Sequence, residues 1–261
     1  KAGTKIIEYL EHEDVDVSGI AIIEERVTTV KTRMLASRES LIQGEQLLLR
    51  WDVEGDEPIP EHALQVIYDQ AIQNLENADC VILSDYGQGV VYDSGVERIA
   101  KHAKELNIPI IADPKLTGLH RTHDVDWIIF QSRGFELMKR RIGESDDSQA
   151  AESLINSYGW KHLVVLAGGN GVTIYSKSAD TVHAPCTLPQ LRQVIGLIDA
   201  AVVAIAVSIS NGLGVSDTAL LTNAACECIL SAEATDSFSL SKDMLIHQVG
   251  EIAWNLQVSK R

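Results

Sequence analysis

Apolar and polar side chains alternate along residues 15–53, most regularly at 20–23, 27–30 and 47–51. A repeat of two residues is typical of a strand that buries one face and exposes the other. The pattern therefore predicts several short antiparallel strands near the start of the chain, forming a flap on a larger body.

The spacing of apolar residues becomes helical after residue 57. Pro58 and Pro60 open a segment in which apolar side chains recur every three or four residues up to Leu75. Proline is well tolerated in the first turn of a helix, where its missing N–H would have no partner. We therefore expect a helix in this segment.

Strand–helix–strand units follow this helix. An apolar strand at 80–83, a helix at 94–106 and a strand at 108–112 form the first unit, which requires parallel strands. The same order returns at 127–130, 147–158 and 163–166.

The last third of the chain predicts a strand pair at 172–175 and 181–183, and then three helices that begin near Asp199, Ser216 and Ser241. With no long linker or internal repeat, the pattern favours one α/β domain over residues 1–261. Residues 15–54 would form its β flap and residues 55–261 its body.

Composition and charge argue against two classes of partner, nucleic acids and membranes. The 261 residues, 45% of them hydrophobic, suit one large domain, and a formal net charge of −15 opposes general binding to nucleic acid or anionic lipid. The longest apolar run, 200–209, is half of what a membrane span needs, so no membrane partner is expected.

The cysteines and the first residue bear on location and processing. Cys80, Cys186, Cys226 and Cys228 are too scattered for a disulfide framework or a zinc site, which favours a soluble protein in a reducing compartment, either cytoplasm or organelle. Cys226 and Cys228 lie in a helical stretch and are expected to be core thiols. Because the chain begins at Lys1, we expect a processed product or a fragment.

Open parallel sheets bind ligands beyond the carboxyl ends of their strands. In this sequence those positions carry Asp85, Asp113 and a glycine-rich loop at 168–171. Function is expected at that edge of the sheet.

Five short motifs, taken together in their order and spacing, carry a resemblance to a known family. They are Thr-Val-Lys-Thr-Arg at 29–33, Gln-Leu-Leu-Leu-Arg-Trp-Asp at 46–52, Leu-Ser-Asp-Tyr-Gly-Gln-Gly-Val at 83–90, Asp-Pro-Lys at 113–115 and Asn-Ala-Ala at 223–225. The chain resembles the PfkB/ribokinase family of sugar kinases, and within it the heptose 7-phosphate kinase domain of a bifunctional kinase/adenylyltransferase. This implies a ribokinase-like parallel-sheet sandwich with a small β-sheet lid, with the family's N-terminal strands missing from this chain.

The resemblance also implies roles for charged side chains. Lys31, Arg33 and Arg50 would face the sugar or its phosphate from the lid, or else be solvated strand charges. Asp85 would orient substrate or metal-bound water, or else make local turn hydrogen bonds. Lys115 would face a phosphate, or else be a solvated lysine.

The catalytic signature of the family, Gly-Ala-Gly-Asp, is altered. The aligned residues are Gly196, Leu197, Ile198 and Asp199, so the acid that would act as general base is retained. Ile198 brings a stiff β-branched side chain to a place where backbone amides approach phosphate. Asp199 has a second interpretation as the N-cap of the helix that follows.

Two further motifs of the family are altered in this sequence. The magnesium motif Asn-x-x-Glu is replaced by Gln131 and Gly134, so no metal ligand is assigned, although Glu136 lies two residues further on. In the nucleotide loop Gly171 is kept but both family hydroxyls are lost. By resemblance, Gly169, Gly171, Gly196, Asn223 and Lys115 would contact the nucleotide.

These departures lead to three hypotheses. The first is a PfkB-type pseudokinase that serves as a structural or regulatory subunit, in a homo-oligomer or a larger assembly. The second is an active kinase that uses ATP and Mg²⁺ to phosphorylate a sugar phosphate. The third is a protein that binds a sugar phosphate or a nucleotide without turnover.

Overall fold

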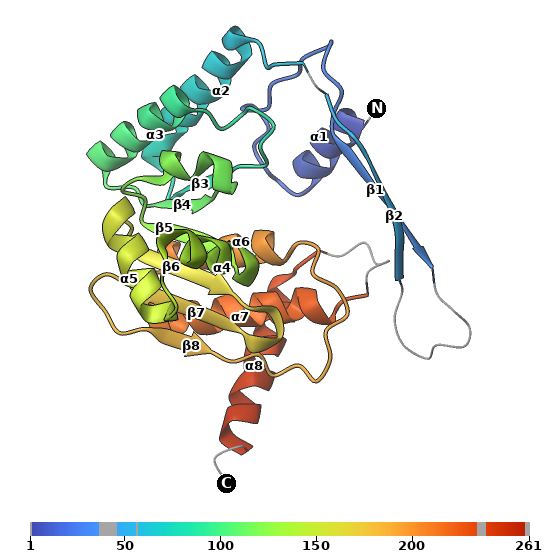
Figure 1. Ribbon diagram of the computed structural model, residues 1–261. Helices are drawn as coiled ribbons and strands as arrows, with labels where there is room; N and C mark the ends of the chain where they lie inside the picture. The colour runs from blue at the N-terminus through green and yellow to red at the C-terminus, as the bar shows by residue number, and fades with distance from the viewer. Residues whose placement is uncertain (1, 37–45, 56, 234–238, 259–261) are drawn as a thin grey trace. The chain divides into compact units, whose positions relative to one another are not determined.

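The computed structural model describes residues 2–36, 46–55, 57–233 and 239–258 (Figure 1). The chain divides into two compact units, residues 1–76 and 77–261, which are described separately. The expectation of a single domain with a β lid and an α/β body stays a prediction.

The first unit contains a two-stranded antiparallel ribbon, in which Lys31 lies opposite Asp52 and the register shifts between Met34 and Leu35. Pro60 is the N-cap of the helix predicted after residue 57, which confirms that prediction. The elements of this unit are α1 (Ala2–His12), β1 (Val30–Ala36), β2 (Gln46–Val53) and α2 (Glu61–Asn74).

The alternating pattern of this unit predicted more strands than are formed. Residues 20–23 and 27–29 have irregular backbone, so the strands predicted there are wrong. Ile20 and Ile22 are 42% and 77% exposed, and alternation without a face to bury does not stabilise a strand. The short helix α1 was not predicted.

The second unit is built on a six-stranded sheet in the order β3-β4-β5-β6-β7-β8. The first four strands are parallel, as predicted, and the last two continue the sheet antiparallel. The strands are β3 (Val81–Ser84), β4 (Ile110–Asp113), β5 (Trp127–Gln131), β6 (His162–Leu166), β7 (Val172–Ser176) and β8 (Val182–Ala184).

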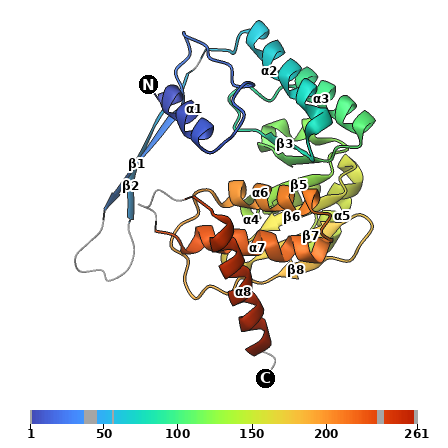
Figure 2. The same ribbon diagram turned by 180° about the vertical axis from the view of Figure 1, so that it is seen from behind.

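Helices cover both faces of this sheet. The alternation within β5 shows the two layers, since Trp127 and Ile129 belong to one apolar core and Ile128 and Phe130 to the other. One core is closed by α3 (Asp93–Leu106), α4 (Ser132–Ile142) and α5 (Asp147–Tyr158). The other is closed by α6 (Leu197–Ser210) and α7 (Val215–Ser231), with α8 (Lys242–Val258) against α7 (Figure 2).

All four cysteines are free thiols, and Cys226 and Cys228 are buried in α7, which confirms their prediction as core residues. Burial raises the pKa of the Cys226 thiol to about 12. Among the helices that the structure describes, none is long and apolar enough to cross a bilayer.

Candidate active site

Three aspartates gather at the carboxyl edge of the sheet in the second unit. Asp85 follows β3, Asp113 ends β4, and Asp199 lies in the first turn of α6. The backbone N–H of Asp85 donates to the carbonyl oxygen of Asp113 at 2.9 Å. Burial, with the charges of Asp199 and Asp85, raises the pKa of the Asp113 carboxyl to about 6 against the opposing charge of Lys115. The edge concentrates negative charge and takes up a proton at mildly acidic pH.

The phenol of Tyr86 joins the turn after β3 to α6. Its O–H donates to Oδ1 of Asp199 at 2.9 Å, across 113 residues of sequence. Burial and this hydrogen bond raise the pKa of Tyr86 to about 12, so the hydroxyl remains a donor at neutral pH. One oxygen of the candidate base is thus engaged by a side chain to which the sequence assigned no role.

Asp85 makes local hydrogen bonds in its turn. Its Oδ1 accepts from the backbone N–H of Gly87 at 2.7 Å, and its Oδ2 lies 3.4 Å from Nη1 of Arg121, which also pairs with Asp93. A Cβ at Gly118 would lie 2.6 Å from this Oδ2, so glycine is needed for the close approach. This geometry matches the turn interpretation of Asp85, and a substrate role stays a prediction. No sequence motif pointed to Arg121.

Lys115 lies between β4 and the 3₁₀ helix η2 (Leu116–Thr122), with an exposed side chain. Its Cγ is 3.6 Å from the position of a Cβ on Gly87, so its aliphatic stem packs over the turn that holds Asp85. It forms no ion pair with any residue that the structure describes. Lys115 is therefore available to an anion, as its predicted role requires.

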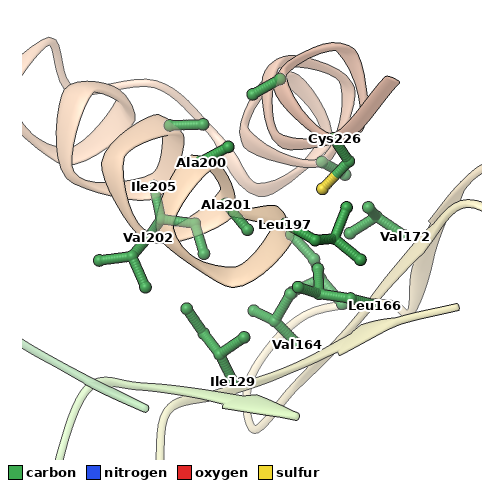
Figure 3. Close-up of a cluster of buried hydrophobic side chains, with 14 of the residues drawn as sticks. Ile129, Val164, Leu166, Val172, Leu197, Ala200, Ala201, Val202, Ile205 and Cys226 are labelled. Carbon is green, nitrogen blue, oxygen red and sulfur yellow. The ribbon is translucent and has the colours of Figure 1, made fainter. Parts of the chain in front are cut away.

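The first turn of α6 is anchored in the core. Leu197 is buried and Ile198 packs against the same apolar cluster (Figure 3 shows Leu197 directed toward Val172 and Leu166). The N-cap is Gly196, with a φ of 84°, and it has no side chain to cap the first amides. Asp199 is exposed and is the third residue of the helix, so the interpretation of Asp199 as the N-cap is wrong.

The glycine-rich loop forms the 3₁₀ turn η3 (Gly168–Asn170). Gly171 has a φ of 88°, and a Cβ there would lie 2.1 Å from the carbonyl oxygen of Ala184. A Cβ on Gly169 would meet Cδ1 of Leu191 at 3.4 Å. Gly171 is thus required by close packing against the end of β8, whatever the loop binds.

Asn223 is buried among structural partners. Its Nδ2 donates to the carbonyl oxygen of Pro185 and to Oε1 of Glu227, both at 3.1 Å. The fully buried Glu227 carboxylate also accepts from the backbone N–H and hydroxyl of Thr187 and from Nε2 of Gln248. Asn223 thus belongs to a polar cluster beneath the loop that follows β8, which the sequence did not reveal.

The lid charges belong to the first unit, and two of them are paired there. Nζ of Lys31 lies 2.7 Å from Glu54 and 3.3 Å from Asp52, and Arg50 also pairs with Asp52. Arg33 lies opposite Arg50 in the ribbon and makes no ion pair with the described residues. Among Lys31, Arg33 and Arg50, Arg33 is therefore the one that no described carboxylate neutralises.

Comparison with known proteins gives the family. A model of the pfkB family carbohydrate kinases matches residues 1–242. The chain belongs to this family. Its curated relatives include the bifunctional protein HldE of Syntrophotalea carbinolica, 23% identical over 89% of this chain and 46% of the relative. HldE of Sulfurimonas denitrificans is 24% identical over 92% and 49%. This PfkB-family chain thus spans about half the length of those relatives.

Solved structures show the same fold at low identity. Ribokinase from Thermotoga maritima superposes with a TM-score of 0.70 and 17% identity, over 96% of this chain and 78% of the other. The tetrameric inhibited form of phosphofructokinase-2 from Escherichia coli gives 0.69 and 16%, with the same coverage. The predicted ribokinase-like fold is confirmed.

The altered magnesium motif of this PfkB-family chain offers no carboxylate at its own positions, since Gln131 ends β5 and Gly134 lies in α4. Within the described ranges, no three His, Cys, Asp or Glu side chains are grouped to hold a metal ion. Glu136, the one acid near the altered motif, is held by Lys139 at 2.8 Å on α4.

Proposed function

We propose that this chain is a PfkB-family protein with impaired phosphoryl transfer that serves as a structural or regulatory subunit. The observation that carries the proposal is the anchoring of Leu197 and Ile198 in the core at the start of α6. In a working anion hole, small residues let backbone amides surround the transferring group. Loss of one preorganised donor costs about 10²–10³ in rate.

A second function is supported by the exposed carboxylate of Asp199. In an active kinase, this group would take the proton of the acceptor hydroxyl while Lys115 bound phosphate and Lys31, Arg33 and Arg50 bound a sugar phosphate. ATP and Mg²⁺ would be the cofactors. Asp199 is accessible, and Tyr86 orients one of its oxygens.

The subunit role calls for a partner, and the ribbon of the first unit supports one. Leu48 and Trp51 on β2 are 65% and 62% exposed. Exposed apolar side chains on a two-stranded ribbon, together with its unpaired edges, favour association. We propose that the chain works in a homo-oligomer or a larger protein assembly.

The test is a search for turnover by the full chain. ADP formation from ATP, Mg²⁺ and heptose 7-phosphate is expected at background, and the double variant Leu197→Ala/Ile198→Gly, which restores the family signature, is expected to raise it at least tenfold. Val202→Ala, which removes core volume one turn further along α6, controls for loosened packing. Circular dichroism confirms that each variant is folded.

Three outcomes separate the hypotheses. Wild-type turnover that Asp199→Asn abolishes would overturn the proposal and establish the kinase. Thermal stabilisation by heptose 7-phosphate or ATP without ADP formation would point to a ligand sensor. Neither binding nor turnover in the wild type leaves the subunit role.

A further inference from the structure

A cavity lies at the amino edge of the sheet, at the other end of the strands from the three aspartates. It is open to solvent and has a volume of about 820 Å³ where β4, β5 and β6 begin, in the range of small-molecule sites. Its apolar lining comes from the end of α3 and the segment that enters β4. These residues are Ala100, Ala103, Ile108, Pro109 and Ile110.

The walls of this amino-edge cavity are fixed by the backbone. Asn107, Asp124 and Gly159 all line it and all have left-handed φ angles, of 57°, 61° and 76°. Asn107 and Gly159 are the C-caps of α3 and α5, and the N–H of Asp124 donates to the carbonyl oxygen of Tyr158 at 2.8 Å. At these two helix ends the carbonyl oxygens of Ala103, Lys104, Ile155 and Tyr158 already accept backbone N–H groups, so the capped helix ends form a fixed wall.

The rim carries positive charge in a strongly acidic chain. Lys101 and Lys104 line the cavity from successive turns of α3, and neither forms an ion pair with a described residue. The third lysine, Lys161, is paired with Asp126 at 2.5 Å, and the other oxygen of Asp126 accepts from the N–H of Ile110. Lys101 and Lys104 are thus the charges left for a ligand, with Asp124 as the opposing acid.

A stack of aromatic rings ends at the same place. The imidazole of His123 lies 5.0 Å from the ring of Tyr158, which in turn stacks on the buried Trp160 at 4.7 Å. His123 is exposed and lines the cavity, and no other ring of the described residues stacks on it. A planar ring in the cavity would extend this stack.

We propose that the amino-edge cavity binds a nucleoside monophosphate, with its base against His123 and its phosphate between Lys101 and Lys104. The amino group of a base would meet the carboxylate of Asp124, and the apolar lining would cover the sugar. This site is separate from the carboxyl edge and does not depend on the function proposed there.

The test is a calorimetric titration of the full chain with AMP. Lys101→Ala/Lys104→Ala is expected to weaken binding at least tenfold, and His123→Ala at least threefold. Adenosine, which lacks the phosphate, and ribose 5-phosphate, which lacks the base, are each expected to bind at least tenfold more weakly than AMP.

Matched variants show at which edge of the sheet AMP binds. Lys177→Ala removes a lysine outside the cavity, and Lys115→Ala removes the cation of the carboxyl edge; both are expected to leave AMP binding unchanged. The proposal is overturned if AMP does not bind at millimolar concentration, if the double lysine variant binds as the wild type does, or if only Lys115→Ala abolishes binding. None of these results depends on whether the chain turns over ATP.

Discussion

The two edges of the central sheet have opposite electrostatic character, although the same strands form both. At the carboxyl edge, Asp199 and Asp85 act on Asp113, and Lys115 and Arg121 are the cations beside these aspartates. At the amino edge the cavity has three lysines and two aspartates in its lining. The fold places a crevice at the ends of parallel strands, but the connecting loops decide which charge it presents.

This contrast bears on phosphate chemistry. A family of kinases needs an electropositive carboxyl edge, supplied by amides, lysines or metal, to receive transferring phosphoryl groups. In this chain burial, and then the charges of Asp199 and Asp85, raise the pKa of Asp113 at the carboxyl edge, where Lys115 is the one lysine in that balance, while Lys101 and Lys104 both line the cavity at the amino edge. The site expected from the family and the site expected from charge therefore lie at different edges.

The largest expected effect on stability comes from a substitution at Gly171, at the carboxyl edge of the sheet. An added Cβ there would meet backbone atoms, the carbonyl oxygen of Ala184 at 2.1 Å and the N of Cys186 at 2.7 Å, on top of a left-handed φ. We expect Gly171→Ala to lower the free energy of unfolding by about 2–5 kcal/mol, the sum of overpacking and left-handed strain. Urea denaturation measures the loss.

Two other glycines with left-handed φ angles provide a comparison for this prediction. At Gly159, on the amino edge, the Cβ would meet Oδ1 of Asp124, a side-chain atom that can move, and at Gly143 it would meet nothing within 4 Å. The expected order of destabilisation is Gly171→Ala, then Gly159→Ala, then Gly143→Ala at about 1 kcal/mol. Equal losses in all three would mean that φ alone matters and that the packing of Gly171 does not.

The sequence predicted the second unit well because its signals are local. Apolar runs such as 108–112 and 163–166, separated by helical spacing, identify buried parallel strands regardless of the rest of the fold. The helix α4 was missed because its eleven residues expose many charges and bury only Phe135 and Met138. In the first unit alternation overpredicted strands, since at 20–23 no apolar layer forms.

The candidate site was predicted only in part because its contacts are long-range. Motif spacing identified Asp113, the last residue of β4, and Asp199, in the first turn of α6. The partners Tyr86, Arg121 and Glu227 act across 113, 36 and 40 residues, and no pattern in one sequence reports such pairs. The amino-edge cavity was missed for the same reason, since three separate segments of the chain line it.

Asp113 provides an electrostatic test of the carboxyl edge. Its pKa is raised from 3.8 to about 6, first by burial and then by Asp199, so the folded state binds a proton more tightly than the unfolded state. Stability is then highest below pH 4 and falls as pH rises to 6. We expect Asp113→Asn to remove this fall and to stabilise the protein by about 2 kcal/mol at pH 8, with no gain at pH 4.

Thermal denaturation between pH 4 and 8 measures this effect. Asp180→Asn, at an exposed position between β7 and β8, controls for the loss of one negative charge from an acidic chain. A gain at pH 8 equal to that of Asp180→Asn would show that net charge, rather than the aspartate cluster, accounts for the stabilisation.

His162, the first residue of β6 at the amino edge, is expected to titrate with the opposite sign and a smaller effect. Its ring stacks on Trp127 at 4.0 Å and its Nδ1 lies 2.8 Å from the hydroxyl of Ser176. Burial lowers its pKa to about 4, with Lys161 acting in the same direction and Asp126 against it. The unfolded state binds the proton more tightly, so stability is complete above pH 6.5 and falls as pH drops toward 4.

We expect His162→Phe, which keeps a ring on Trp127, to remove this acid-side loss, discounted to about 1 kcal/mol because the imidazole is partly exposed. His183→Phe controls for the loss of a histidine, since His183 also contacts a hydroxyl, that of Thr173, but at an exposed position. In the wild type, between pH 4 and 6.5, acidification raises the stability contributed by Asp113 and lowers the stability contributed by His162, so the two effects oppose each other. The variant at Asp113 should therefore lose stability on acidification and the variant at His162 should gain it. If both variants keep the wild-type pH profile, the two edges do not differ electrostatically in the way that their side chains imply.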